Sequence, residues 1–96
     1  MKYCGFDVAR MGSDYSVLTN ITFGETVRVD RIDFFSKLEL MELCGWSIQI
    51  FKKMFPDKIT VDMIGVGAGV YDRLNEQGFP VVGVNVAEAR SEERRV

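Results

Sequence analysis

Two aspartates, Asp7 and Asp62, are the residues of this chain whose type and position best suit chemistry. Asp7 stands between Phe6 and Val8, and Asp62 lies inside the apolar run ITVDMI. A carboxylate within an apolar strand is costly to bury unless it is paired or bound to a metal ion. Two carboxylates a few ångströms apart repel each other unless one is protonated or a cation lies between them. The pair therefore predicts a metal site.

The ligand chemistry of these acids favours Mg²⁺ or Mn²⁺. Mg²⁺ takes oxygen ligands and keeps several waters, so two protein carboxylates and a substrate phosphate suit it. Either aspartate alone has a simpler interpretation as a turn-capping or salt-bridged residue, with Arg10 as the candidate partner of Asp7. Asp14 follows the Gly12-Ser13 turn, and two roles suit it equally: an Asx-type hydrogen bond to the backbone, or a role at the metal.

The composition excludes several kinds of site. The chain of 96 residues contains no histidine, which rules out Ser-His and Cys-His nucleophilic sites and histidine metal cages. Cys4 and Cys44 lack metal-ligand spacing and stand in apolar surroundings, which favours two buried free cysteines. The net charge of −2 argues against binding nucleic acid by bulk charge alone. Catalysis would have to come from carboxylates, lysines, hydroxyls or a bound metal.

The elements that hold Asp7 begin with three predicted strands. Their patterns place them over residues 2–7, 15–23 and 26–35, joined by tight turns into an antiparallel meander. In the third strand, plain alternation puts Val27, Val29, Arg31 and Asp33 on one face and Arg28, Asp30, Ile32 and Phe34 on the other. The charged residues of this strand are expected to be solvated.

The second half of the chain is predicted to alternate helices and strands. A capping box at Ser36–Glu39 opens a helix that Pro56 ends. Gly45 in its middle either costs about 1 kcal/mol relative to alanine or lets the helix approach the sheet closely. A strand over 58–64, a helix over 70–77 and a strand over 80–86 follow. The helical crossover makes the first and fourth strands parallel neighbours, so Asp7 and Asp62 meet near their C-terminal ends.

This order of elements predicts one α/β domain over residues 1–96, with a mixed sheet and a charged tail at 87–96. A loop with glycines at Gly65, Gly67 and Gly69 precedes the second helix. The loop lacks the third glycine of a dinucleotide fingerprint and the Lys-Ser/Thr ending of a Walker A loop. Its backbone amides at a helix N-terminus suit a nucleic-acid phosphate, but a tight strand-to-helix turn explains the glycines as well.

Three stretches together carry a resemblance that runs from about Tyr3 to Val86. GFDVARMGSDYSVL, VDMIGVGAGVYDRL and VVGVNV closely resemble the nuclease domain of the large terminase subunit of tailed phages and prophages. The resemblance implies a ribonuclease H-like fold and a metal-dependent endonuclease that cuts concatemeric double-stranded DNA during packaging. It implies that Asp7 is a catalytic acid bridging two metal ions, that Asp62 is a second catalytic acid holding one of them, and that Asp14 is an additional acid.

The resemblance also implies partners and a location. The family acts in the cytoplasm of the bacterial host, and its full-length subunit, with a packaging ATPase, engages the small terminase subunit and the portal. Arg10 and the loop glycines would contact DNA. The family's third catalytic acid lies past the fifth strand, and the nearby acids Glu88, Glu92 and Glu93 do not match its motif. The resemblance thus implies a fragment that cuts DNA weakly or not at all.

Other functions stay open. Actin-like and sugar-kinase ATPases also start with a strand, an aspartate and a hairpin turn, but their phosphate-binding hairpins are richer in Gly and Ser/Thr than ARMGSD. A non-catalytic remnant or assembly module would use its acids structurally. The sheet edge at 81–86 can pair with another copy, so a homodimer is open as well. No stretch is apolar for the roughly 18 residues of a membrane span, and no membrane partner is expected.

Overall fold

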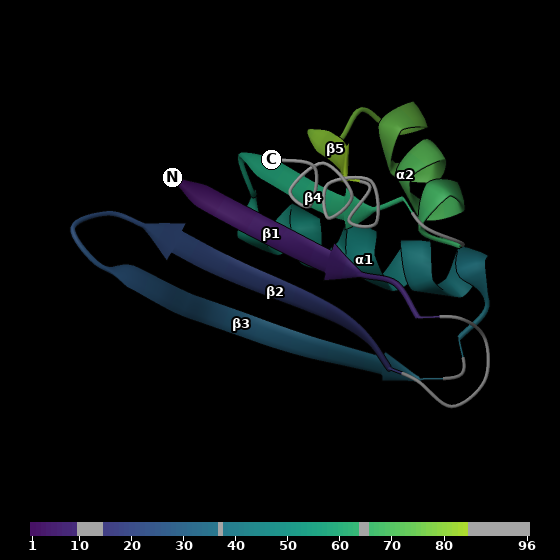
Figure 1. The fold of residues 1–96 in the computed structure, drawn as a ribbon, viewed down its shortest axis with the longest axis horizontal. Coiled ribbons are helices and arrows are strands. Elements are labelled where there is room, and N and C mark those ends of the chain that lie inside the picture. The colour runs from purple at the N-terminus through teal and green to yellow at the C-terminus, as the bar shows by residue number, and fades with distance from the viewer. Residues whose placement is uncertain (10–14, 37, 64–65, 85–96) are drawn as a thin grey trace, which may run out of the picture.

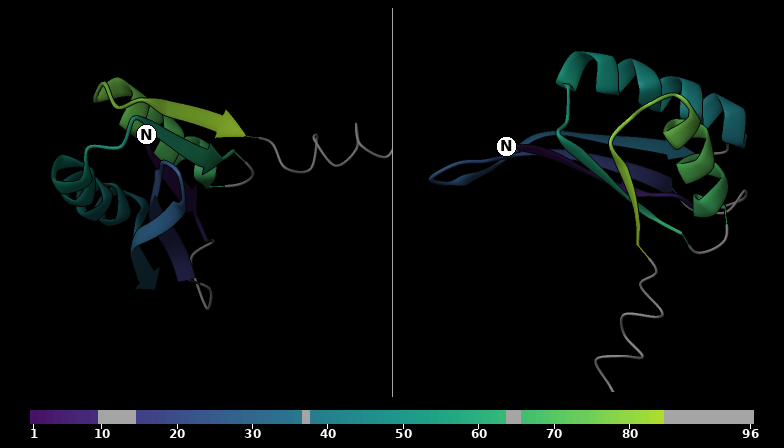
Figure 2. Two further views of the ribbon diagram at one scale, coloured as in Figure 1. Left: turned by 90° about the vertical axis from the view of Figure 1, so that its left-hand side faces the viewer. Right: turned by 90° about the horizontal axis from the view of Figure 1, so that it is seen from above.

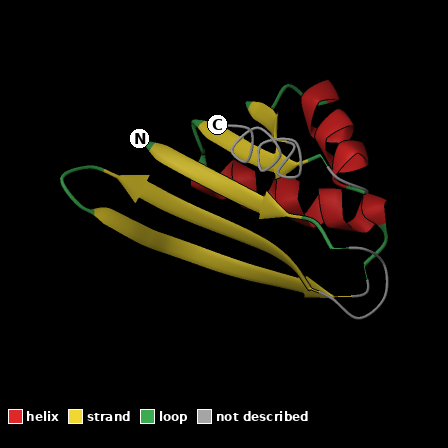
Figure 3. Ribbon diagram, in the orientation of Figure 1, coloured by secondary structure: helices red, strands yellow, loops and turns green. Residues whose placement is uncertain are grey.

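In the part of the chain that the structure describes, five strands form one mixed sheet that carries two helices (Figure 1). The structure is a computed structural model and describes residues 1–9, 15–36, 38–63 and 66–84. The elements are β1 (Lys2–Asp7), β2 (Tyr15–Phe23), β3 (Val27–Ser36), α1 (Leu40–Met54), β4 (Lys58–Asp62), α2 (Gly67–Glu76) and β5 (Val81–Val84). The strand order is β3-β2-β1-β4-β5. The predicted α/β architecture, an antiparallel meander followed by helix-strand-helix-strand, is confirmed (Figure 3).

Both helices pack on the same face of the sheet (Figure 2). Cys4 and Phe6 of β1 pair with Ile59 and Val61 of β4, and all four side chains are buried. They join one core with the buried residues of β2, α1 and α2, which are Leu18, Leu43, Cys44, Ile50, Phe51, Val70 and Leu74. The opposite face, called the open face below, carries the alternate residues of β1, β2 and β4. In the described part of the chain, no helix covers it.

The helix α1 starts later than predicted. Ser36 is the last residue of β3, where it pairs with Tyr15, so it does not cap a helix. Glu39 is the N-cap and makes no capping hydrogen bond with its side chain. The predicted capping box is therefore wrong, because Ser36 pairs with Tyr15 as part of β3. Gly45 is exposed and has open space where a Cβ would lie, so a close approach to the sheet is also excluded.

The alternation of β3 also differs from the prediction. Asn20 pairs with Arg31 and the next residue, Ile21, pairs with Val29, so Asp30 is an extra residue in β3. Such a bulge shifts the phase of the side chains on either side of it. As a result, four apolar residues share the open face, namely Val27, Val29, Ile32 and Phe34. The charged residues Arg28, Arg31 and Asp33 lie on the side that carries the helices.

The remaining bounds differ from the prediction in smaller ways. β4 ends at Asp62, and α2 begins at Gly67, three residues before the predicted start. The predicted last strand contains β5, whereas its final two residues and the tail at 87–96 lie outside the described residues. Neither helix of the described part is long and apolar enough to cross a membrane.

The two cysteines are free and buried, as predicted. Burial, together with the nearby carboxylate of Asp33, raises the pKa of the Cys4 thiol to about 12. Burial also raises the pKa of Cys44, an effect that Arg73 opposes. Both side chains therefore behave as small apolar groups of the core.

Candidate active site

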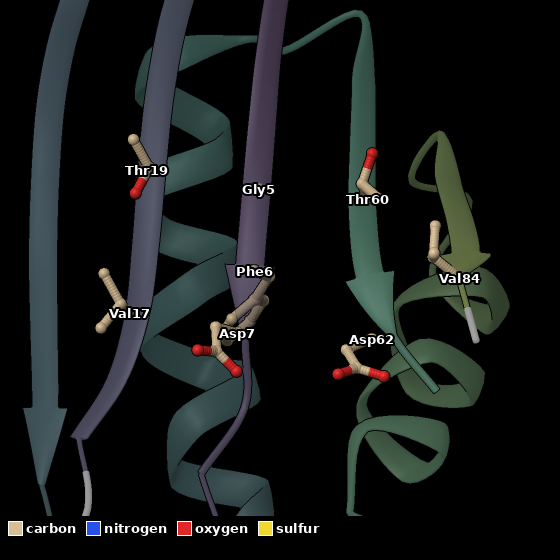
Figure 4. A pocket seen from close by; sticks show the side chains of 8 residues that line it. All are labelled: Gly5, Phe6, Asp7, Val17, Thr19, Thr60, Asp62 and Val84. Atoms are coloured by element: carbon tan, nitrogen blue, oxygen red, sulfur yellow. The ribbon is translucent and has the colours of Figure 1, made fainter. Parts of the chain in front are cut away.

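Parallel pairing of β1 with β4 brings Asp7 and Asp62 together. Phe6 pairs with Val61, so the next residue of each strand lies at the same level of the sheet. Each aspartate is also the last residue of its strand. Figure 4 shows the two side chains projecting from neighbouring strand ends into one hollow. The juxtaposition that the sequence predicts is present in the structure.

The hollow lies on the open face and has a volume of about 580 Å³. Its lining residues come from four strands and are Gly5, Phe6, Asp7, Val17, Thr19, Thr60, Asp62 and Val84. Gly5 is exposed and has open space above its Cα, so nothing fills the middle of the hollow from β1. A second hollow of about 560 Å³ at the other end of the open face is lined by Lys58 and by no acid. The chemistry of this face is thus concentrated at Asp7 and Asp62.

A buried serine holds the chain that follows Asp7. The Ala9 N–H donates a hydrogen bond of 2.9 Å to Ser16 Oγ, which anchors the residues just beyond β1 to the start of β2. Asp7 itself is paired with Val17, the neighbour of Ser16. The sequence pattern does not distinguish Ser16 from the other residues of β2 as a residue of the site. The only available signal was its place on the β2 face that also carries the buried Leu18.

The end of β4 is held by a close contact with α2. A Cβ on Gly67 would lie 1.6 Å from the carbonyl oxygen of Asp62, so only glycine lets the first turn of α2 pack against this strand end. The Met63 N–H donates to the Val84 carbonyl at 2.8 Å, which ties the same strand end to β5. A Cβ on Gly69 would meet Leu40 of α1 at 3.0 Å. Packing thus accounts for Gly67 and Gly69, and their phosphate-binding role stays a prediction.

Three of the predicted site residues lie outside the described residues. They are Arg10, Asp14 and Gly65. Asp7 and Asp62 are therefore the carboxylates that the structure assembles, and among the described residues no group of three or more Asp, Glu, Cys or His side chains could hold a metal.

The two acids suit a hard divalent cation. Asp7 is exposed and Asp62 is half-buried, so an ion between them could keep several of its waters. Mg²⁺ is commonly bound by one or two protein carboxylates, and its remaining coordination positions are filled by waters and substrate phosphates. The residues present therefore fit the metal that the sequence predicts, although their roles as ligands stay a prediction.

Comparison with known proteins gives matches in structure only. No family model matches the sequence, and no curated protein sequence matches it. The large terminase nuclease of thermophilic phage G20c matches with a TM-score of 0.73 at 14% identity, over 98% of this chain and 49% of that one. The nuclease domain of the large terminase subunit gp2 of bacterial virus Sf6 matches with a TM-score of 0.65 at 20% identity, over 85% and 35%.

A third match is a nuclease of a different kind. RuvC of Thermus thermophilus, solved in complex with a Holliday junction substrate, has a TM-score of 0.68 at 13% identity, over 88% of this chain and 65% of that one. A mutant of the Sf6 domain was solved with manganese and beta-thujaplicinol. The chain spans less than two thirds of each of these proteins, and the low identities show the fold alone.

The arrangement of strands and the structural matches agree with each other. In the described residues, this chain has a five-stranded mixed sheet with order β3-β2-β1-β4-β5 and two helices, and its fold matches the terminase nuclease of phage G20c and RuvC with TM-scores of 0.73 and 0.68. The resemblance to terminase nuclease domains that the sequence predicts is confirmed at the level of the fold. The chain has a ribonuclease H-like fold.

Proposed function

We propose that this chain is the nuclease core of a large terminase subunit and cuts double-stranded DNA with the help of Mg²⁺ or Mn²⁺. The observation that carries the proposal is the position of Asp7 and Asp62 at the ends of adjacent parallel strands, on the open face of a ribonuclease H-like sheet. Carboxyl ends of strands in α/β sheets are the usual place for functional groups. The manganese in the related Sf6 structure supports the choice of metal.

In this proposal Asp7 and Asp62 hold the metal and Asp14 is an additional ligand. A divalent ion bound between carboxylates can polarise a phosphoryl oxygen and lower the pKa of a bound water. The protein's own contribution is to fix both carboxylates at one level of the sheet and to leave room for the phosphodiester above Gly5. Arg10 and the loop glycines are proposed to contact the DNA backbone.

The wider setting belongs to the proposal as well. A large terminase subunit packages concatemeric viral DNA in the bacterial cytoplasm, together with its small subunit and the portal. The chain covers 49% of the G20c nuclease and 35% of the Sf6 nuclease domain, and none of the acids near residue 88 matches the third catalytic acid of the family. We therefore expect this chain alone to cut DNA weakly, with metal binding as the more direct readout.

The first test is a calorimetric titration of Mn²⁺ into the wild-type chain and into two variants, Asp7→Asn and Asp62→Asn. Each variant replaces one negatively charged carboxylate with a neutral amide and is expected to lower the affinity for Mn²⁺ at least about tenfold. Glu25→Gln is the matched control, because Glu25 is an exposed acid at the far end of the β2–β3 hairpin. This control is expected to bind Mn²⁺ like the wild type.

A cleavage assay follows with double-stranded DNA and Mn²⁺, with and without a chelator. Cutting that persists in Asp7→Asn would contradict the assignment of the catalytic acids. If the wild-type chain binds no Mn²⁺, the chain keeps the fold without the chemistry, and the non-catalytic assembly module becomes the better interpretation.

A further inference from the structure

Six of the exposed large apolar side chains in the described residues gather on one side of the β2–β3 hairpin. They are Tyr15, Phe23, Val27, Val29, Ile32 and Phe34, with exposed fractions between 45% and 64%. Strand pairing places them on the open face, because Phe34, Ile32, Val29 and Val27 pair with Val17, Thr19, Ile21 and Phe23 in turn. We call these six residues the hairpin patch. Figure 1 shows the hairpin extending beyond both helices.

The polarity of β3 is the reverse of what an ordinary sheet strand shows. A strand with one covered face normally turns its apolar residues toward the helices and its charges toward water. In β3 the ion pairs Arg28–Asp30 and Arg31–Asp33 lie away from the open face, and the apolar residues point to solvent. The bulge at Asp30 produces this separation, since plain alternation would put Arg31 beside Val29. The arrangement suggests that the open face of the hairpin is covered by a partner.

The hairpin patch lies at the upper end of the size range of apolar patches on monomeric proteins. With exposed fractions of 45–64% and side-chain areas of about 150–250 Å² for the aromatic residues, it exposes on the order of 600 Å². The largest apolar patch of a typical monomer is about 300–600 Å² and is often functional. The apolar surface is extended by two half-buried residues of β2, Val17 and Ile21. It is also extended by Tyr3, whose ring contacts that of Phe23. A standard interface needs roughly 800 Å² from each partner, which this face approaches.

We infer that a second copy of this chain covers the hairpin patch, so that two hairpins pack face to face about a two-fold axis. The patch contains no charged side chain, so its partner must be apolar, and a two-fold arrangement supplies an identical apolar surface. A nucleic-acid strand would instead require cations to neutralise its phosphates. Packing of two twisted sheets at about 10 Å would interlock the side chains of the two patches.

The dimer uses the face of the hairpin and not its edge. β3 is the edge strand of the sheet, it contains the charged residues Arg28, Asp30, Arg31 and Asp33, and the bulge at Asp30 interrupts it. Charged residues and bulges are features that protect an edge strand from pairing with another chain. The patch reaches the active-site hollow, since Phe34 pairs with Val17 and Val17 pairs with Asp7. The second copy therefore forms a wall on the β2 side of the hollow and leaves the β4 side open.

The test is the mass of the chain in solution, measured by sedimentation velocity over a wide range of concentration. The wild type is expected to be a dimer at high concentration. Ile32→Lys and Phe34→Glu place charges in the patch and are expected to weaken the dimer at least about tenfold. Trp46→Glu is the matched control, since Trp46 is 58% exposed on α1 and lies outside the patch; it should leave the dimer intact.

Two further variants keep the outcome decisive. If a charged variant fails to fold by circular dichroism, the double variant Val29→Thr with Ile32→Thr retains β-branched side chains and is used in its place. Val82→Lys tests the β5 edge, where Val82 is exposed. A wild-type monomer at every concentration, a dimer insensitive to the patch variants, or a dimer broken by Val82→Lys alone would each overturn the inference. None of these outcomes depends on whether the chain cuts DNA.

Discussion

At the scale of single residues, the proposed metal site depends on side chains that do not touch the metal. Ser16 is the clearest example, because it accepts the Ala9 N–H and so fixes the chain just beyond Asp7. It lies on the helix side of the sheet, while Asp7 lies on the open side. Ser16 is thus a positioning residue.

Ser16→Ala is expected to destabilise the protein by about 1–2 kcal/mol, since the partly buried Ala9 N–H loses its acceptor. It should also weaken Mn²⁺ binding, because Asp7 loses its support. Ser47→Ala is the control: its buried hydroxyl donates to the Leu43 carbonyl within α1 at 2.7 Å, far along the chain from either acid. Denaturant unfolding and calorimetry measure both effects. Equal losses of Mn²⁺ affinity in the two variants would mean that Ser16 acts only through stability.

The buried thiols predict how stability depends on alkaline pH. The pKa of Cys4 in the folded protein is about 12, above the value of 9.0 for a free thiol. A raised pKa means that the folded state keeps a proton that the unfolded state releases, so stability is full below pH 9 and falls as pH rises toward 12. Between these two pH values, one thiol lowers the free energy of unfolding by up to about 1.4 kcal/mol per pH unit.

Cys4→Ala is expected to reduce this alkaline loss, and unfolding in denaturant at several pH values checks it. The variant also loses packing, so its stability at neutral pH serves as the reference. An unchanged slope in Cys4→Ala would show that other groups, such as Cys44, whose pKa burial also raises, cause the loss.

At the scale of elements, the junction between β4 and α2 controls the position of Asp62. Gly67 allows the first turn of α2 to contact the Asp62 carbonyl, and Gly69 allows α2 to pack against Leu40 of α1. A strand end held by a helix turn is a rigid support for its last side chain. The glycine loop therefore has a structural task at the site whether or not it binds phosphate.

Gly67→Ala is expected to destabilise the protein by about 1–3 kcal/mol or more, because backbone atoms must move to admit the methyl group. Gly45→Ala offers the opposite case: the position is helical, exposed and open, so alanine should stabilise the protein by about 1 kcal/mol. Thermal unfolding of both variants shows whether each substitution raises or lowers the stability of the protein. The contact at Gly67 would be refuted by a neutral Gly67→Ala variant with unchanged Mn²⁺ affinity.

At the scale of the whole molecule, the sheet has one face covered by helices and one face that carries both the acids and the hairpin patch. The two features meet along β1 and β2, where Asp7 pairs with Val17 and Val17 with Phe34. Metal binding and partner binding would thus act on the same surface. A ligand that binds only the folded state stabilises the whole molecule by mass action.

Mn²⁺ at about a hundred times its dissociation constant is therefore expected to stabilise the wild type by about 2.7 kcal/mol. Because its affinity is expected to be at least about tenfold lower, Asp7→Asn should gain at most about 1.4 kcal/mol at the same concentration, and a chelator should reverse the effect in the wild type. Thermal unfolding at fixed protein concentration measures the shift, since the proposed dimer also makes stability depend on concentration. A shift of equal size in the wild type and in Asp7→Asn would place the metal elsewhere.

Local patterns in the sequence determined most of the fold. β1 and β2 have the predicted bounds, and the order of elements is as expected, because apolar periodicity and turn residues act over short stretches of chain. The helical crossover made β1 and β4 parallel neighbours, and that rule alone brought Asp7 and Asp62 to one edge of the sheet. The resemblance to terminase nucleases pointed to the same fold by another route.

Tertiary structure decided what depends on contacts between distant residues. Pairing of Ser36 with Tyr15 moved the start of α1, and the bulge at Asp30 moved the apolar residues of β3 to the open face. The contact of Gly67 with the Asp62 carbonyl also joins two elements that no periodicity relates. Such features arise from register and close packing, which the local pattern of a strand or helix does not encode. The sequence located the acids, and the packing of the sheet determined which surface surrounds them.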